Sequence, residues 1–217
     1  MITQNLTKNH FLYTKEWESM AEIQNPHRNL VILERTISSD LQDFLLLLQK
    51  EPEVPTIQGT FPLHRIKSTF KKYLQQFYNL NVHGYQALIE DVYQLAWQFS
   101  QLVQQRDIKV YFAKIDNSMC RLFHTDANEL RLLCTYWGAG TQWVDNNNIR
   151  PITAEANTNA ARIKDLSKVF SIKAYDVGIL KGALHDHLAT NALMHRSPPL
   201  ENNECRLLLR LDTENVL

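Results

Sequence analysis

The chain has 217 residues, with 23 Lys plus Arg and 23 Asp plus Glu, so its formal net charge is zero. This neutral balance excludes the strong basic field that attracts nucleic acid or an anionic membrane surface. Three cysteines without paired spacing favour a reducing compartment over a disulfide framework. The N-terminus lacks the apolar core of a signal peptide, and the most apolar run, residues 44–48, is too short to span a bilayer. We therefore expect a cytoplasmic protein.

A short strand is predicted at 29–33, and helical patterns dominate the rest of residues 1–107. Ser39 and Gln42 have capping-box spacing and predict a helix start, and Pro52 ends that helix. Residues 56–63 are predicted as a loop. Apolar stripes predict amphipathic helices over 64–78 and 85–105, and the basic cluster within the first of these is interpreted as a solvated face.

The second half of the chain is rich in β-forming residues separated by turn signals. Strands are predicted at 108–115, 120–124, 130–137, 141–144, 174–180, 192–195 and 205–211. A short helix is predicted at 160–169. We therefore predict one α+β domain over residues 1–217, with mainly helical support in 1–107 and a β-sandwich or small-barrel core in 108–217.

Two histidines, one carboxylate and one arginine in this half have the side-chain types of a facial-triad iron site. His124 and Asp126 lie at the exit of a predicted strand, where a period of two places them on one face. His195 ends a later strand and could supply the third ligand. Such a triad leaves three coordination positions open for a co-substrate and oxygen. Arg206 begins the next strand, where antiparallel pairing would bring its guanidinium near His195 to bind a carboxylate bidentately.

Each of these residues also fits an ordinary structural role. His124 suits a capping or core histidine, and His195 suits a hydrogen bond to backbone near the turn that follows it. Arg206 suits an ion pair with Asp126 or with Glu204. The sequence therefore leaves open a fold of this class that binds no metal.

Other motifs carry less information. His185 and His187 form a His-x-His pair of a kind that binds zinc, although an exposed polar loop is the favoured interpretation. Cys120 could be a soft metal ligand or a small buried residue. The sequence has no Cys-x-x-Cys, Gly-x-Gly-x-x-Gly or Walker motif, and Ser197 lacks the glycines of a nucleophile elbow.

Several motifs of the second half occur together. They are Cys120-x-x-Phe123-His124-x-Asp126, Leu130-Arg-Leu-Leu133, Thr135-Tyr136-x-Gly138-x-Gly140-Thr141-x-Trp143, Lys181-Gly182 and His195-Arg-Ser-Pro-Pro199. Together they resemble the bacterial family known as domain of unknown function 1826. The resemblance implies a bacterial cytoplasmic protein associated with zinc-limitation genes and metallochaperone GTPases, and it implies no established activity.

The order His-x-Asp, later His and later Arg is also similar, more distantly, to Fe(II)/2-oxoglutarate-dependent dioxygenases of the prolyl-hydroxylase-like branch. This resemblance implies a double-stranded β-helix, jelly-roll or cupin-like, with supporting N-terminal helices. It further implies Fe(II) on His124, Asp126 and His195. The co-substrate 2-oxoglutarate would then pair with Arg206.

The same resemblance nominates further residues around the co-substrate. Arg196 is the alternative carboxylate clamp, because it directly follows a proposed ligand. Tyr136, Thr141 and Trp143 are candidates to line the pocket, and Trp143 suits the core equally well.

Two functions follow from these patterns. The first is an Fe(II)/2-oxoglutarate-dependent oxygenase that hydroxylates an unknown small-molecule or protein substrate. The alternative is a non-catalytic module of the same fold that binds zinc and works with a metallochaperone partner. Neither involves nucleic acid or a membrane.

Overall fold

The structure is a computed structural model of the chain. It describes residues 9–77, 84–117, 119–151, 153, 160–185, 191–201 and 204–213. No helix in these ranges is both long enough and apolar enough to cross a membrane.

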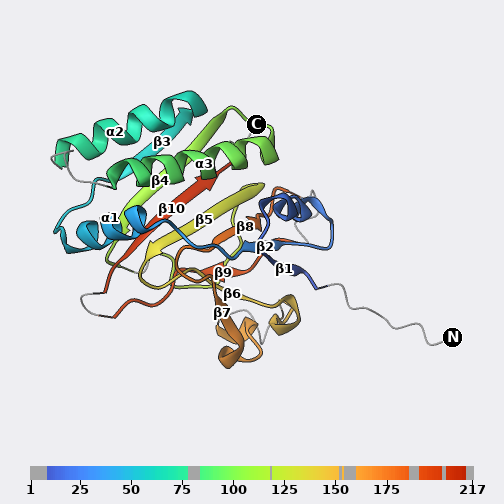
Figure 1. The fold of residues 1–217 in the computed structure, drawn as a ribbon. Helices are drawn as coiled ribbons and strands as arrows, with labels where there is room; N and C mark the ends of the chain where they lie inside the picture. Colours follow the sequence, from blue (N-terminus) through green and yellow to red (C-terminus); the bar gives the residue numbers. More distant parts are fainter. Residues whose placement is uncertain are drawn as a thin grey trace.

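Within the described residues, the strands form two sheets (Figure 1). The larger sheet contains, in spatial order, β1 (Phe11–Thr14), β2 (Leu30–Leu33), β8 (Val177–Lys181), β5 (Leu130–Trp137), β10 (Arg206–Asp212), β4 (Asp107–Ile115) and β3 (Ile57–Pro62). The smaller sheet contains β7 (Val169–Ser171), β6 (Gln142–Val144) and β9 (His195–Arg196). The α+β class is thus confirmed, and the part predicted as mainly helical support also supplies β1, β2 and β3.

Three α-helices form a layer over one face of the larger sheet (Figure 1). They are α1 (Ser39–Lys50), α2 (Ile66–Phe77) and α3 (Tyr85–Val103). Short 3-10 helices lie at Trp17–Gln24, Leu63–Arg65, Asn146–Asn148, Ala160–Arg162 and Leu166–Lys168. All three predicted α-helices are confirmed, because their apolar residues recur at the helical period and give each helix one buried stripe.

Helix α1 begins at Ser39 as predicted, but the residue that caps it differs from the prediction by one position. The Ser38 hydroxyl, rather than that of Ser39, accepts the backbone N–H of Leu41 at 3.3 Å. The side chain of Gln42 donates to the carbonyl of Ile37 at 3.1 Å. These bonds satisfy the first turn in a different way from a capping box.

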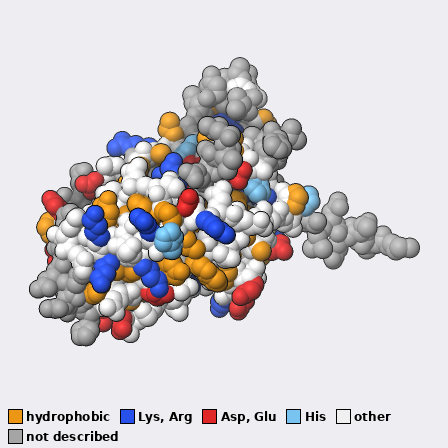
Figure 2. All heavy atoms as spheres, turned by 90° about the horizontal axis from the view of Figure 1, so that it is seen from above, with side chains coloured by type: hydrophobic (Ala, Val, Ile, Leu, Met, Phe, Trp, Pro, Cys, Tyr) orange, Lys and Arg blue, Asp and Glu red, His pale blue; other side chains and the backbone are white. Residues whose placement is uncertain are grey.

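The outer surface of the helix layer is charged. Seen from above the helices, Lys and Arg side chains lie among apolar ones (Figure 2). Lys67 on α2 pairs with Glu90 on α3 at 2.5 Å, and its ammonium lies 4.2 Å from the centroid of the Tyr93 ring. These contacts are those of a solvated helix face, as predicted for the basic cluster.

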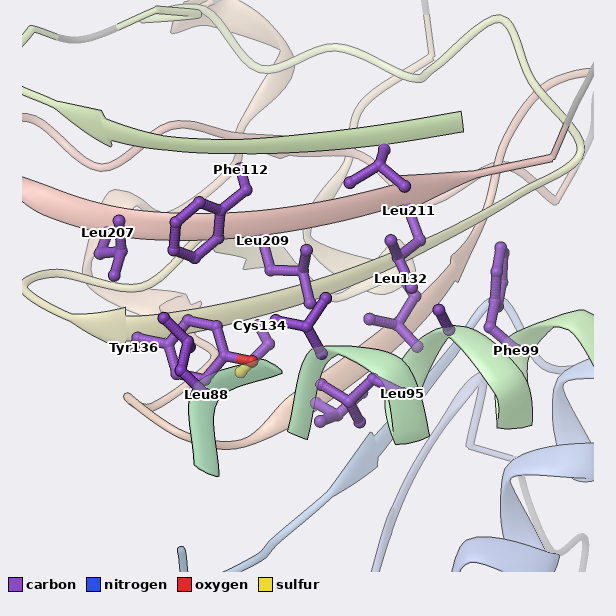
Figure 3. Close-up of a cluster of buried hydrophobic side chains, with 14 of the residues drawn as sticks. Leu88, Leu95, Phe99, Phe112, Leu132, Cys134, Tyr136, Leu207, Leu209 and Leu211 are labelled. Carbon is purple, nitrogen blue, oxygen red and sulfur yellow. The ribbon is translucent and has the colours of Figure 1, made fainter. Parts of the chain in front are cut away.

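Side chains of the larger sheet alternate between two faces, and each face has its own core. The helix-side cluster, partly drawn in Figure 3, includes Leu88, Leu95, Phe99, Phe112, Leu132, Cys134, Tyr136, Leu207, Leu209 and Leu211. The cluster on the opposite face includes Leu30, Ile32, Ala113, Ile115, Leu133, Trp143, Leu180, Leu193 and Leu208. Burial of one such aliphatic side chain contributes roughly 1.5–3 kcal/mol. Because Trp143 comes from β6, the second cluster lies between the two sheets.

Three segments differ from their predictions. Residues 56–63, predicted as a loop, contain edge strand β3, which pairs antiparallel with β4 and tolerates Pro62 because it has a free edge. Residues 160–169, predicted as a helix, form two 3-10 turns and the start of β7. There the Asp165 carboxylate accepts the N–H of Ser167 and competes with helical bonding. Residues 120–124, predicted as a strand, form a single bridge at His124.

Candidate metal centre

The two histidines are placed by one pair of backbone hydrogen bonds. The N–H of His124 donates to the carbonyl of His195, and the N–H of His195 donates to the carbonyl of His124, both at 2.9 Å. Residues that exchange both bonds lie directly opposite each other and project their side chains to the same face. The two rings lie close, with centroids 4.6 Å apart. Two residues distant in the sequence thus meet at the edge of the small sheet.

Asp126 completes a cluster with these histidines. Its Oδ2 lies 3.2 Å from Nε2 of His195, and its Oδ1 lies 3.6 Å from Nε2 of His124. One donor atom from each residue lies within 4.8 Å of the other two. Asp126 and His195 are buried, whereas His124 is half-buried and leaves the cluster open on one side. The structure therefore brings together all three residues predicted as metal ligands.

Both imidazoles are held in the same tautomer by backbone. Nδ1 of His124 lies 3.0 Å from the carbonyl oxygen of Leu122, and Nδ1 of His195 lies 3.1 Å from that of Leu193. Because a carbonyl only accepts, each Nδ1 carries a proton and donates it. Each Nε2 then faces Asp126, where it can bind a metal as part of a neutral ring or donate to the carboxylate when the ring is protonated. Metal-binding histidines commonly use such a bond to fix ring orientation.

The Asp126 carboxylate is kept ionised by its neighbours. Burial alone would raise its pKa, but the adjacent rings of His124 and His195 and the charge of Arg131 hold the pKa well below its usual range. The hydrogen bond to this carboxylate raises the pKa of His124, against the opposing effect of burial. Arg131 forms an ion pair with Oδ2 of Asp126. The cluster thus holds a negative charge between two imidazoles.

The donor set fits a divalent transition metal. Oδ2 of Asp126 is buried between Arg131 and the His195 ring, and its charge is balanced by the ion pair with Arg131. Ligand atoms bound to one ion at about 2.1 Å in a right-angled arrangement are about 3 Å apart, close to the spacing of the pairs seen here. Two neutral imidazoles and one carboxylate suit Fe(II) or Zn(II).

Arg206 and Thr141 line the same pocket as the two histidines. The pocket is a half-open cavity of about 60 Å³. Its walls include Met119, Cys120, His124, Arg131, Leu133, Thr141, His195, Ser197, Arg206, Leu208 and Arg210. Arg206 is 2% exposed, and its Nη atoms donate to the hydroxyls of Thr141 at 3.4 Å and Ser197 at 3.2 Å.

The Arg206 guanidinium is buried without an anionic partner. Among the described residues, no carboxylate lies within ion-pair distance of it, and its Nε has no hydrogen-bond partner. Burial lowers the pKa of Arg206 to about 10, and the opposing effects of Tyr111 and Cys120 do not offset it. A buried charge of this kind is costly unless it is paired. The pocket therefore offers a preformed site for an anion.

Two glycines bring these walls together. Gly138 has a φ of +81°, and a Cβ there would lie 2.4 Å from the carbonyl oxygen of Cys205 and 2.8 Å from Cα of Arg206. A Cβ on Gly140 would lie 1.6 Å from the carbonyl oxygen of Ile172. Only glycine permits these approaches. The Gly-Ala-Gly motif thus lets the chain leave β5 and place Thr141 beside Arg206.

Arg206 reaches the pocket by a different route from the predicted one. The sequence predicts pairing with the strand of His195, but β10 pairs with β4 and β5, and β9 pairs with β6. Arg206 and His195 therefore come from different sheets and converge across the space between them. Strand pairing between distant segments is not encoded in the local pattern.

Arg196 lies on the other side of the small sheet from His195. Neighbouring residues on a strand point to opposite faces. The Arg196 guanidinium lies 4.4 Å from the centroid of the Phe123 ring, and its Nε donates to Gln142 at 2.8 Å. The structure therefore places the charged group of Arg196 away from the two imidazoles, although the residue borders the pocket.

Tyr136, predicted to line the pocket, lies instead in the helix-side core (Figure 3). It is fully buried, and its hydroxyl donates to Asp91 of α3 at 2.7 Å. The same carboxylate binds Arg35 through two bonds, of 2.5 and 3.0 Å. The prediction failed because Tyr136 shares its face of β5 with Leu132 and Cys134. Trp143 is likewise a core residue, fully buried between the sheets.

This position makes a testable distinction. Replacing Tyr136 with phenylalanine should lower the free energy of unfolding by about 1–2 kcal/mol, because the half-buried Asp91 loses a donor. The affinity for 2-oxoglutarate should not change. Urea unfolding and a co-substrate titration measure the two effects separately, and a variant with normal stability but weakened co-substrate binding would contradict this placement.

The remaining candidates do not join the cluster. Cys120 borders the pocket but its thiol is not among the clustered donor atoms. His185 is described and lies outside the cluster as well, whereas His187 lies outside the described residues. Sequence reasoning missed Arg131 and Ser197. Arg131 lies in an otherwise apolar strand, where no motif distinguishes it from a solvated arginine.

Comparison with known proteins supports a common fold. A model of the family described as "Protein of unknown function (DUF1826)" matches residues 14–212. The structure is similar to dioxygenase for auxin oxidation 1 from Arabidopsis thaliana in its binary complex with 2-oxoglutarate, with a TM-score of 0.55 and 10% identity over 93% of this chain and 91% of that one. It is also similar to the dioxygenase for auxin oxidation in rice, with a TM-score of 0.52 and 10% identity over 94% and 82%. No curated protein sequence matches the chain.

Proposed function

The chain belongs to the DUF1826 family, and we propose that it is an Fe(II)/2-oxoglutarate-dependent oxygenase. The observation that carries the proposal is that residues of a metal site and of an anion site line the same pocket. One wall holds the two histidines of the His-Asp-His cluster, and another holds a buried arginine without a carboxylate partner among the described residues. A metal alone would account for the first site but not for the second. A metal together with a dicarboxylate accounts for both.

The fold supports this assignment. We take the larger and smaller sheets as the two sheets of a double-stranded β-helix, with the helices packed on the outer face of the larger one. The cluster lies at the edge of the small sheet and faces the space between the sheets. The similar solved structures are dioxygenases, and at 10% sequence identity they support the fold alone. The argument for metal chemistry in this chain rests on the donor atoms of its own residues, His124, Asp126 and His195.

Each residue then has a defined task. His124, Asp126 and His195 would hold Fe(II), and their bonds to backbone would keep both rings oriented. Arg206 would bind the distal carboxylate of 2-oxoglutarate, with Thr141 and Ser197 holding the guanidinium in place. With Fe(II) bound, such a centre uses O₂ to convert 2-oxoglutarate to succinate and CO₂ while one oxygen atom enters a C–H bond of the substrate.

A direct test is an anaerobic titration of metal-free protein with Fe(II) and then 2-oxoglutarate, followed by visible absorbance. We expect a weak charge-transfer band that requires both components. The band should be absent in His124→Ala and present in His64→Ala, which removes an exposed histidine before α2. Tight zinc binding without any band would instead favour the zinc-handling module, and a search for its metallochaperone partner would follow.

A further inference from the structure

One positively charged residue contacts the proposed metal carboxylate directly. Arg131 forms an ion pair through Nη1 with Oδ2 of Asp126, and its Nε donates to Oδ1 of Asp212 at 2.5 Å. All three side chains are largely buried. Among the described residues, Arg131 is the one side chain outside the ligand set within ion-pair distance of Asp126. Nothing in the proposed chemistry requires a cation at this position.

The strand pairing fixes the position of Arg131. It lies on β5 directly opposite Asp212 on β10, and both residues point toward the small sheet. Asp212 also accepts a bond from the side chain of Asn128 at 3.0 Å. The backbone of Leu130 pairs with Thr213 just beyond the end of β10. Arg131 is therefore anchored on the rigid part of the fold.

Asp126 lies in a less regular segment. It follows the single bridge at His124 and precedes β5, so no strand pairing orients its side chain. One backbone bond, from the N–H of Ala183 to the carbonyl of Asp126 at 2.7 Å, holds the main chain. With a metal bound, the two imidazoles near its carboxylate would bind the metal through Nε2. They would then no longer orient the carboxylate. Arg131 is the neighbour that remains to orient the carboxylate.

We propose that Arg131 is a positioning residue that holds the Asp126 carboxylate in place for metal binding. This role rests on the proposed metal centre and adds to it a specific anchor on the larger sheet. It links the ligand of an irregular segment to Asp212 through a two-armed guanidinium. Lysine cannot reproduce this geometry, because its single ammonium lacks a planar fork.

Two physical effects of Arg131 act in opposite directions, which makes the role testable. A positive charge beside a divalent cation is repulsive, so electrostatics alone predicts that neutralising Arg131 would tighten metal binding. Loss of an orienting partner predicts the reverse, because contacts behind a metal ligand are commonly worth about 10- to 100-fold in affinity. The sign of the change therefore separates the two effects.

The experiment measures Co(II) affinity of Arg131→Gln by visible absorbance, with Arg210→Gln as the matched control. Arg210 borders the pocket and pairs with the same Asp212 at 3.0 Å, but no contact joins it to Asp126 or to either histidine, so it is a control for affinity for the metal alone. Both variants remove one positive charge from the same network. We expect Arg131→Gln to bind Co(II) about 10- to 100-fold more weakly. We expect Arg210→Gln to bind as tightly as the wild type, and Arg131→Lys to lie between them.

Each alternative result is decisive. Equal or tighter binding by Arg131→Gln would overturn the positioning role and leave electrostatics as the explanation. Equal weakening in both variants would overturn it as well, since general loss of the network would then suffice. Thermal unfolding of the metal-free proteins checks that each variant folds, and Arg131→Lys provides the comparison if the glutamine variant does not. A wild-type protein that binds no Co(II) would overturn the metal centre itself, which distinguishes that failure from failure of the anchor.

Discussion

Replacing Arg206 with glutamine is expected to weaken 2-oxoglutarate binding by about 30-fold or more. Removal of one partner from a buried, hydrogen-bonded charge pair costs about 2–5 kcal/mol, and each 1.4 kcal/mol corresponds to about tenfold in affinity. Glutamine keeps polar atoms near Thr141 and Ser197 but has neither the charge nor the fork. The loss is measured as the co-substrate concentration that gives half of the Fe(II) charge-transfer band.

The same substitution should leave the metal-free protein at least as stable as the wild type. Arg206 is buried without a carboxylate among the described residues, and its Nε has no hydrogen-bond partner there, so its charge opposes folding until an anion binds. Arg196→Gln is the matched control, because its guanidinium packs on Phe123. Undiminished affinity in Arg206→Gln would assign the co-substrate to another group. Loss in Arg196→Gln would move the role to that residue.

Replacing Asp126 with asparagine should abolish detectable Fe(II) binding. The amide retains the size of the side chain but removes the anionic donor that the two imidazoles face. It also leaves Arg131 with Asp212 as its remaining partner, so the free energy of unfolding of the metal-free protein should fall by about 3 kcal/mol. Metal content after dialysis and urea unfolding measure the two effects.

Asp43→Asn provides the control for this variant. Asp43 is an exposed acidic residue on α1, and its substitution removes the same charge without touching the cluster. It should retain both metal binding and stability. Normal metal affinity in Asp126→Asn would contradict the triad, and would direct attention to the zinc-binding alternatives instead.

The parts of the fold with strong local patterns could be predicted from the sequence. Leu88, Val92 and Phe99 belong to a clear apolar stripe that predicts a helix over 85–105. The observed helix α3 spans Tyr85–Val103. Edge strand β3 was missed because Gly59 and Pro62 are typical of turns. Its strand conformation is shown by its pairing with β4. Pairing between distant segments depends on the whole chain, which a local pattern does not contain.

The candidate site shows the same division. The types and order of His124, Asp126 and His195 were sufficient to nominate them, and the structure brings them together. The prediction for Tyr136 rested on its side-chain type and was wrong, because the alternation along β5 turns this residue toward the helices. Arg131 was missed because an arginine in an apolar strand has no recognisable motif. Its contact with Asp126 became visible only in three dimensions.

The alternation along β10 has a consequence for how this protein can be altered. The leucines at 207, 209 and 211 face the helices, whereas the intervening residues, Arg206, Leu208 and Arg210, border the pocket. One face of this short strand therefore contributes to the helix-side core, and its other face contributes to the wall of the pocket. A library that varies only positions 208 and 210 would reshape the pocket while the helix-side core and Arg206 stay intact. Because Leu208 also packs in the core between the sheets, such a library should keep position 208 apolar, and selectivity is then altered mainly through position 210.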